Sequence, residues 1–124
     1  MSSKAYGQEL ILSFHEVPAE FFDVEKIEKT AKGLVDEIGM TKGPIMCWPN
    51  SDKTQDTGVP RKSGGISCIQ FLEESSCTLH CLNEIQCVYL NLFSCKAFNS
   101  TKAKNYAQKH IGGKLVQERV LVRP

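Results

Sequence analysis

The hydrophobic positions of this 124-residue chain change their spacing several times, and each change predicts a different element. From Gln8 to His15, apolar and polar residues alternate, which is typical of a β-strand with one buried face. Beyond Pro18, apolar residues recur every three or four positions as far as Ile38, which predicts a helix. Asp23 precedes the helix as a suitable N-cap, and Gly39 follows it as a stop signal.

In the middle of the chain, the pattern predicts strands and loops but no helix. Residues 44–48 form a short apolar run, and strands are predicted again over 66–72, 76–82 and 86–94. The polar breaks between the last three are short, so these strands should form an antiparallel meander. Residues 49–65 are rich in Pro, Gly, Ser and Thr, and a loop of this length is usually either a functional lid or disordered.

The last part of the chain predicts a helix and then a strand. Asn99 or Ser100 can cap the helix, Gly112 and Gly113 can end it, and residues 114–122 alternate again. The apolar face of this helix comprises Ala103, Tyr106, Ala107 and Ile111. Two helices suffice to cover one face of one sheet. The predicted fold class is therefore α+β, a two-layer sandwich with a mainly antiparallel sheet and two helices on one face.

The other face of the sheet has an unusual composition. On residues 86–94, Val88, Leu90 and Leu92 suit a face under the helices, whereas the alternate positions mix aromatic and polar groups. A face exposed to water would carry more charge. We therefore expect this face to meet another subunit, with polar groups held for chemistry inside the interface. The alternative is that the long loop covers it.

Length and charge narrow the possible classes of protein. The length suits one domain, so residues 1–124 are expected to form a single domain. Fifteen basic and fourteen acidic residues give a net charge of +1 without a basic stripe, which argues against a nucleic-acid partner. No apolar run approaches the roughly 18 residues of a membrane helix, and the N-terminus lacks the apolar core of a signal peptide. A cytoplasmic protein without a membrane partner is expected.

Six cysteines are many for a cytoplasmic protein, yet they suggest neither disulfides nor a metal site. Nothing indicates secretion, and the chain has no C-x-x-C pair. Cys77 and Cys81 are four residues apart on a predicted strand, or about 13 Å, which is too far for one zinc ion to bind both. We expect no metal and interpret most of the cysteines as small buried hydrophobic residues. The six are Cys47, Cys68, Cys77, Cys81, Cys87 and Cys95.

Four residues in the middle of the chain suit a reaction centre. Taken singly, Ser75 is a turn serine, His80 a half-buried strand histidine, Ser67 a strand-start serine and Cys95 a core cysteine. As a set, they share the spacing of a known family. Ser67 lies eight residues before Ser75, and His80 and Cys95 follow it by five and twenty. The segments ESSCTLH and FSC resemble the ESHLTIH and FTC segments of the prokaryotic S-adenosylmethionine decarboxylases. His15 and His110 match no motif and are interpreted as structural.

The resemblance implies a proenzyme that cuts itself between Glu74 and Ser75. The hydroxyl of Ser75 would attack the carbonyl of Glu74, and elimination and hydrolysis would leave a pyruvoyl group derived from Ser75. That group would form a Schiff base with the substrate amine and act as an electron sink when carbon dioxide leaves. His80 would be the base, Ser67 a hydrogen-bond donor to the tetrahedral species, and Cys95 the acid that returns a proton.

The same residues set a geometric condition. On one continuous strand, Ser75 and His80 would point to opposite faces, because they are five residues apart. They can meet only if the chain turns between them or just before Ser75. The polar residues 73–76 lie where the meander needs that turn.

The chain also departs from the family pattern near its substrate-binding residues. The family segment T-W-P-E after the histidine is replaced by residues 81–84, which read CLNE. Glu84 is retained and could bind ribose hydroxyls. Leu82 replaces the tryptophan, so a stacking surface is missing there. Trp48 could replace it from the second strand. Ser76 stands where the family has a histidine.

The function implied is pyruvoyl-dependent decarboxylation of S-adenosylmethionine for spermidine and polyamine synthesis, by a homodimer or a hetero-oligomer with a homologue. A related arginine decarboxylase, acting on another amino-acid-type substrate, is an alternative. A second is a non-processing binding or regulatory subunit, and a third is an α+β interaction domain without chemistry. With an ordinary serine at position 75, the chain is either the uncut precursor or a member that does not cut itself.

Overall fold

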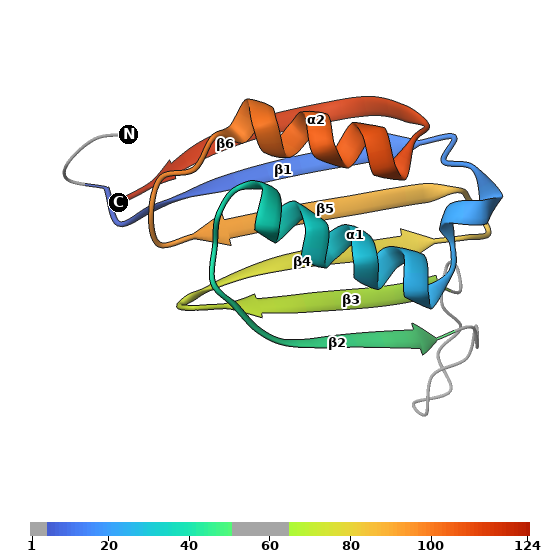
Figure 1. The fold of residues 1–124 in the computed structure, drawn as a ribbon. Coiled ribbons are helices and arrows are strands. Elements are labelled where there is room, and N and C mark those ends of the chain that lie inside the picture. The colour runs from blue at the N-terminus through green and yellow to red at the C-terminus, as the bar shows by residue number, and fades with distance from the viewer. Residues whose placement is uncertain (1–4, 51–64) are drawn as a thin grey trace, which may run out of the picture.

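The computed structural model describes residues 5–50 and 65–124, which form one six-stranded sheet with two helices on one face (Figure 1). The strand order is β2-β3-β4-β5-β1-β6, and every neighbouring pair is antiparallel. The elements are β1 (Gly7–His15), a short 3-10 helix (Ala19–Phe21), α1 (Val24–Glu37), β2 (Lys42–Asn50), β3 (Gly65–Leu72), β4 (Ser75–Leu82), β5 (Cys87–Ser94), α2 (Ser100–Ile111) and β6 (Lys114–Arg123). The predicted α+β two-layer fold and its antiparallel meander are confirmed.

The first strand in the sequence lies inside the sheet. β1 pairs with β5 on one side and with β6 on the other, so the two ends of the described chain meet on neighbouring strands. The meander from β2 to β5 occupies the rest of the sheet. The strand predicted over 44–48 is longer than expected, because β2 extends from Lys42 to Asn50. Most of the loop predicted over 49–65 lies outside the described residues.

α1 begins at the predicted cap Asp23, and α2 begins at Asn99, one of its two predicted caps. The Asp23 side chain accepts a hydrogen bond from the Lys26 amide at 3.0 Å, and the Asn99 side chain accepts one from the Lys102 amide at 2.9 Å. These bonds satisfy amides that have no partner within the helix. Beyond the end of α1, Gly39 has a φ of 72°, a left-handed conformation that glycine adopts without strain.

The core lies between the helices and one face of the sheet. Alternation along β4 buries Leu79 completely and leaves His80 exposed, and along β5 it buries Leu90 and leaves Tyr89 exposed. The largest completely buried side chains include Phe14, Leu10, Leu12, Ile27, Leu34, Leu79, Leu92 and Ile111. Burying each large apolar side chain contributes about 1.5–3 kcal/mol, so this face holds the two layers together.

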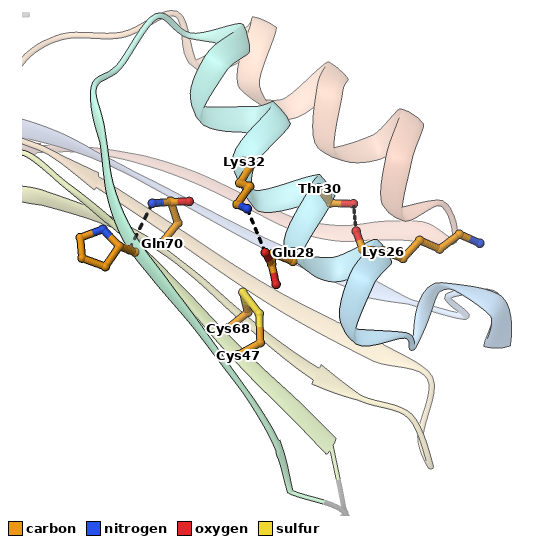
Figure 2. The surroundings of a disulfide bond; sticks show 8 residues. Lys26, Glu28, Thr30, Lys32, Cys47, Cys68 and Gln70 are labelled. Carbon is orange, nitrogen blue, oxygen red and sulfur yellow. Dashed lines mark hydrogen bonds and ion pairs between the residues drawn. A yellow bond between two sulfur atoms is a disulfide. The ribbon is translucent and has the colours of Figure 1, made fainter.

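Cys47 and Cys68 differ from the expectation, because they form a disulfide between β2 and β3 (Figure 2). The antiparallel register places them directly opposite each other, on the side of the sheet that faces α1. No spacing rule in the sequence indicates this pairing. Cys77, Cys81 and Cys87 are buried free thiols, as expected, and burial raises the pKa of Cys77 and Cys81 to about 12. Cys95 is only partly buried.

The second face of the sheet carries large apolar side chains that neither helix covers. They include Met46 and Trp48 on β2, Phe71 on β3 and Tyr89 on β5, and Trp48 is 63% exposed. We call this surface the open face. Within the described parts of the chain, no helix is long and apolar enough to cross a membrane.

Candidate active site

Ser75 and Cys95 lie together at one end of the sheet. The chain turns from β3 to β4 at Glu73 and Glu74, and Ser75 is the first residue of β4. Its hydroxyl oxygen accepts a hydrogen bond from the Cys95 backbone amide at 2.9 Å. Glu74 has a φ of 54°, a left-handed conformation that is unfavourable for a residue with a side chain. The peptide bond between Glu74 and Ser75 therefore lies in a strained turn beside a candidate nucleophile.

A cavity of about 220 Å³ lies beside this turn. Its walls combine polar groups from the turn with residues from the connection between α1 and β2. Among its lining residues are Met40, Thr41, Glu73, Ser75, Cys95 and Lys96. The Cys95 sulfur lies 3.6 Å from the Glu73 carbonyl oxygen and can donate to it. The cavity is thus lined by one residue that carries a hydroxyl and one that carries a thiol.

Ser67 and His80 form the second pair. They are opposite each other in the β3–β4 register, and the Ser67 hydroxyl lies 3.0 Å from Nδ1 of His80. Continuing the same register, Trp48 lies opposite Ser67 and Tyr89 opposite His80. The four residues therefore form one row across β2, β3, β4 and β5. The tautomer of His80 decides which member of the hydrogen-bonded pair donates.

A single chain does not bring the two pairs together. β4 is continuous from Ser75 to Leu82, so Ser75 and His80 are about 17 Å apart along it, on opposite sides of the pleat. The predicted turn does occur before Ser75, at residues 73 and 74. However, it joins β3 to β4 without bending β4. The expected single centre of four residues is thus two pairs within one chain.

The two predicted substrate-binding residues lie nearer to the second pair. Trp48 is in the row of Ser67 and His80, and Glu84 is in the turn that follows β4. That turn is at the opposite end of β4 from Ser75. Neither residue lines the cavity beside Ser75.

Sequence reasoning missed three residues at the Ser75 end. The Tyr6 hydroxyl donates to the Glu74 carboxylate at 3.3 Å, across 68 positions of sequence, and Thr41 and Lys96 line the cavity. No motif spacing points to Tyr6 or Thr41. Lys96 directly follows Cys95 in the sequence, and this adjacency was the one signal that could have placed it near the site. Over residues 5–50 and 65–124, no cluster of three or more His, Cys, Asp or Glu side chains could hold a metal ion.

Comparison with known proteins shows which family the chain belongs to. The sequence profile of the S-adenosylmethionine decarboxylase family matches residues 8–124. The chain belongs to this family. Its fold is similar to the crystal structure of the adenosylmethionine decarboxylase from Aquifex aeolicus VF5, with a TM-score of 0.76 and 18% identity over 98% of this chain and 92% of the other. No curated protein sequence matches the chain.

Membership of the S-adenosylmethionine decarboxylase family confirms the resemblance found in the sequence. Ser67, Ser75, His80 and Cys95 all lie within the matched residues. The structural similarity extends the agreement to the order and packing of the elements. This chain is therefore an S-adenosylmethionine decarboxylase-like protein.

Proposed function

We propose that this chain is the precursor of a pyruvoyl-dependent S-adenosylmethionine decarboxylase that cuts itself between Glu74 and Ser75. The observation that carries the proposal is the bond from the Cys95 amide to the Ser75 hydroxyl, at a strained turn beside a cavity. This bond fixes the Ser75 oxygen but leaves its proton available to a base. Cleavage would also relieve the left-handed conformation of Glu74, which costs about 1–2 kcal/mol.

The proposed cleavage has four steps, in which the atoms balance. The Ser75 oxygen attacks the Glu74 carbonyl carbon, and the C–N bond breaks to give an ester. A base then removes the α-proton of residue 75. Elimination releases Glu74 as a new carboxylate and leaves a dehydroalanine, which tautomerises to an imine. Water hydrolyses the imine, ammonia leaves, and the second fragment begins with a pyruvoyl group.

Two copies of the chain would supply the missing base. In this arrangement, the open faces of two copies pack against each other. The two-fold axis lies between the two sheets, perpendicular to the strands, and passes near Thr78. Because Thr78 lies between Ser75 and His80 on β4, the axis would bring His80 of the partner subunit to the open-face side of the turn that carries Ser75. The Ser75 side chain points to the helix side, so the partner's imidazole would approach the main chain of residue 75, where the α-proton is removed. Two-fold contacts are reciprocal, so two equivalent sites would form. The exposed apolar side chains of the open face support this contact.

The same arrangement assigns roles after cleavage. The pyruvoyl group supplies an electron sink for the loss of carbon dioxide. Cys95 lines the cavity and would return a proton to the substrate carbon. Trp48 of the partner subunit would approach with Ser67 and His80, because the three are in one row. We expect S-adenosylmethionine as the substrate, and a decarboxylated product that serves spermidine synthesis.

A second function, that of a binding or regulatory subunit, has one observation in its favour. Leu82 stands where the family has a tryptophan, and a chain without that stacking surface could bind substrate weakly. Because each chain carries both pairs, it could still complete one site of an active homologue through the open face. Such a chain would not cut itself.

Mass spectrometry separates these two functions. The purified protein is incubated for hours to days, alongside a Ser75→Ala variant as a matched control. The proposed function predicts fragments 1–74 and 75–124 from the wild type, with residue 75 converted to a pyruvoyl group. The control should stay intact. A wild-type chain that stays full length under all conditions would overturn self-processing and favour the regulatory subunit.

A further inference from the structure

Tyr6 reaches the proposed cleavage site from the beginning of the described chain. Its hydroxyl donates a hydrogen bond to a carboxylate oxygen of Glu74 at 3.3 Å. Glu74 is the residue whose carbonyl carbon Ser75 would attack. Tyr6 belongs to none of the family segments quoted above and does not line the cavity beside Ser75.

The backbone and the ring of Tyr6 are each anchored to a neighbouring strand. Its backbone amide donates to the Arg123 carbonyl at 2.7 Å, on β6. Its ring stacks on Phe93 of β5, with centroids 6.3 Å apart and planes inclined by 15°. The Arg123 guanidinium lies 5.5 Å from the Phe93 centroid and pairs with Glu9 of β1. Although Tyr6 is 51% exposed, its backbone and its ring are thus oriented by contacts that do not involve the hydroxyl itself.

The Tyr6 hydroxyl is protonated at neutral pH, as in an ordinary tyrosine, and its surroundings favour that form further. Partial burial raises the pKa of Tyr6, and the Glu74 carboxylate raises it further through its charge and its hydrogen bond. The Cys95 thiol adds a smaller contribution in the same direction. Tyr6 therefore lies within electrostatic range of two groups at the cleavage turn.

We propose that Tyr6 is a positioning residue for self-cleavage, which holds the side chain of Glu74 and thereby the bond that Ser75 attacks. The inference rests on the proposed function. Negative charge develops on the Glu74 carbonyl oxygen during attack, and the carboxylate of the same residue would repel it. A neutral donor that holds this carboxylate at Tyr6 reduces that repulsion. Tyr6 itself transfers no proton.

The decisive variant is Tyr6→Phe, because it keeps the ring that stacks on Phe93 and removes only the hydroxyl. We expect self-cleavage to slow by about three- to tenfold, as for the loss of one ordinary hydrogen bond in a transition state. The thermal midpoint of unfolding should not change. Tyr106→Phe, on α2, is the matched control and should cut at the wild-type rate.

A second comparison tests whether Tyr6 acts through Glu74. In a Glu74→Ala background, adding Tyr6→Phe should cause no further slowing. In the uncut Ser75→Ala chain, the carboxyl ¹³C resonance of Glu74 should shift on Tyr6→Phe and stay unchanged on Tyr106→Phe. A merely structural role would not produce that selective shift.

The outcomes separate this inference from the proposed function. A wild type that cuts, with a Tyr6→Phe variant that cuts equally fast, overturns only the role of Tyr6. The role of Tyr6 is also overturned if Tyr6→Phe slows cleavage equally in the wild-type and Glu74→Ala backgrounds. An unchanged Glu74 resonance on Tyr6→Phe would overturn it as well. A wild type that never cuts overturns both.

Discussion

The hydroxyl of Ser75 is held by the backbone of Cys95, whose amide donates to it at 2.9 Å across 20 positions of sequence. The Cys95 side chain is not part of this bond. Its sulfur lies instead near the Glu73 carbonyl oxygen, at 3.6 Å. The backbone and the thiol of one residue are therefore available for the two separate tasks proposed above, namely orienting Ser75 and transferring a proton.

Replacing the thiol should separate cleavage from decarboxylation. In a Cys95→Ala variant, the amide still donates to Ser75, so we expect fragments 1–74 and 75–124 to form. Release of carbon dioxide from carboxyl-labelled S-adenosylmethionine should fall by about a hundredfold or more, the usual contribution of a general acid. Cys87→Ala, at the buried thiol that begins β5, should retain both activities. If Cys95→Ala fails to cut, the thiol takes part in cleavage as well.

Mixing two inactive variants should restore cleavage if two copies share each site. Ser75→Ala lacks the proposed nucleophile, and His80→Ala lacks the proposed base. A mixed dimer has one site that combines Ser75 of one chain with His80 of the other. We expect the His80→Ala chain to be cut only after mixing and subunit exchange, as measured by mass spectrometry with one chain isotope-labelled.

The two variants incubated separately serve as controls and should both stay intact. An unchanged mixture, under conditions in which exchange is demonstrated by native mass spectrometry, would show that each chain uses its own His80. About 17 Å of β4 would then have to rearrange within a chain, because that length separates the two residues.

Reduction should destabilise the protein through the Cys47–Cys68 disulfide. The two cysteines are 21 residues apart, and a cross-link of that span contributes about 3 kcal/mol by constraining the unfolded chain. We expect reductant to lower the free energy of unfolding by about that amount in the wild type and to have no effect on Cys47→Ala. Unfolded but unreduced protein should titrate four thiols. Six thiols would show that the disulfide does not form.

Alkaline pH should destabilise the fold through the buried thiols. Burial raises the pKa of Cys77 from 9.0 to about 12, so the folded state binds a proton that the unfolded state loses first. Its contribution is complete below pH 9 and is lost as the pH rises to about 12, by up to ~1.4 kcal/mol per pH unit. Urea unfolding between pH 8 and 11 should show a shallower decline for Cys77→Val than for the wild type. Equal slopes would contradict the prediction.

Local patterns predicted most of the fold. Asp23 and Asn99 marked the helix starts because their side chains satisfy amides within the next few residues. Alternation along β4 and β5 separated the buried residues from the open face, because a strand places successive side chains on opposite sides. The pairing of Cys47 with Cys68 escaped prediction, since it depends on the register between two strands.

By itself, the sequence determined the elements, the two-layer α+β class, the family resemblance and the four candidate residues. Each of these depends on short-range spacing along the chain. Only the tertiary structure decided that Ser75 lies with Cys95 and Ser67 with His80, and that Tyr6 reaches Glu74. Those contacts join separate strands, and strand order and register follow from the packing of the whole sheet. A continuous β4 holds the two pairs apart, which spacing alone could not reveal.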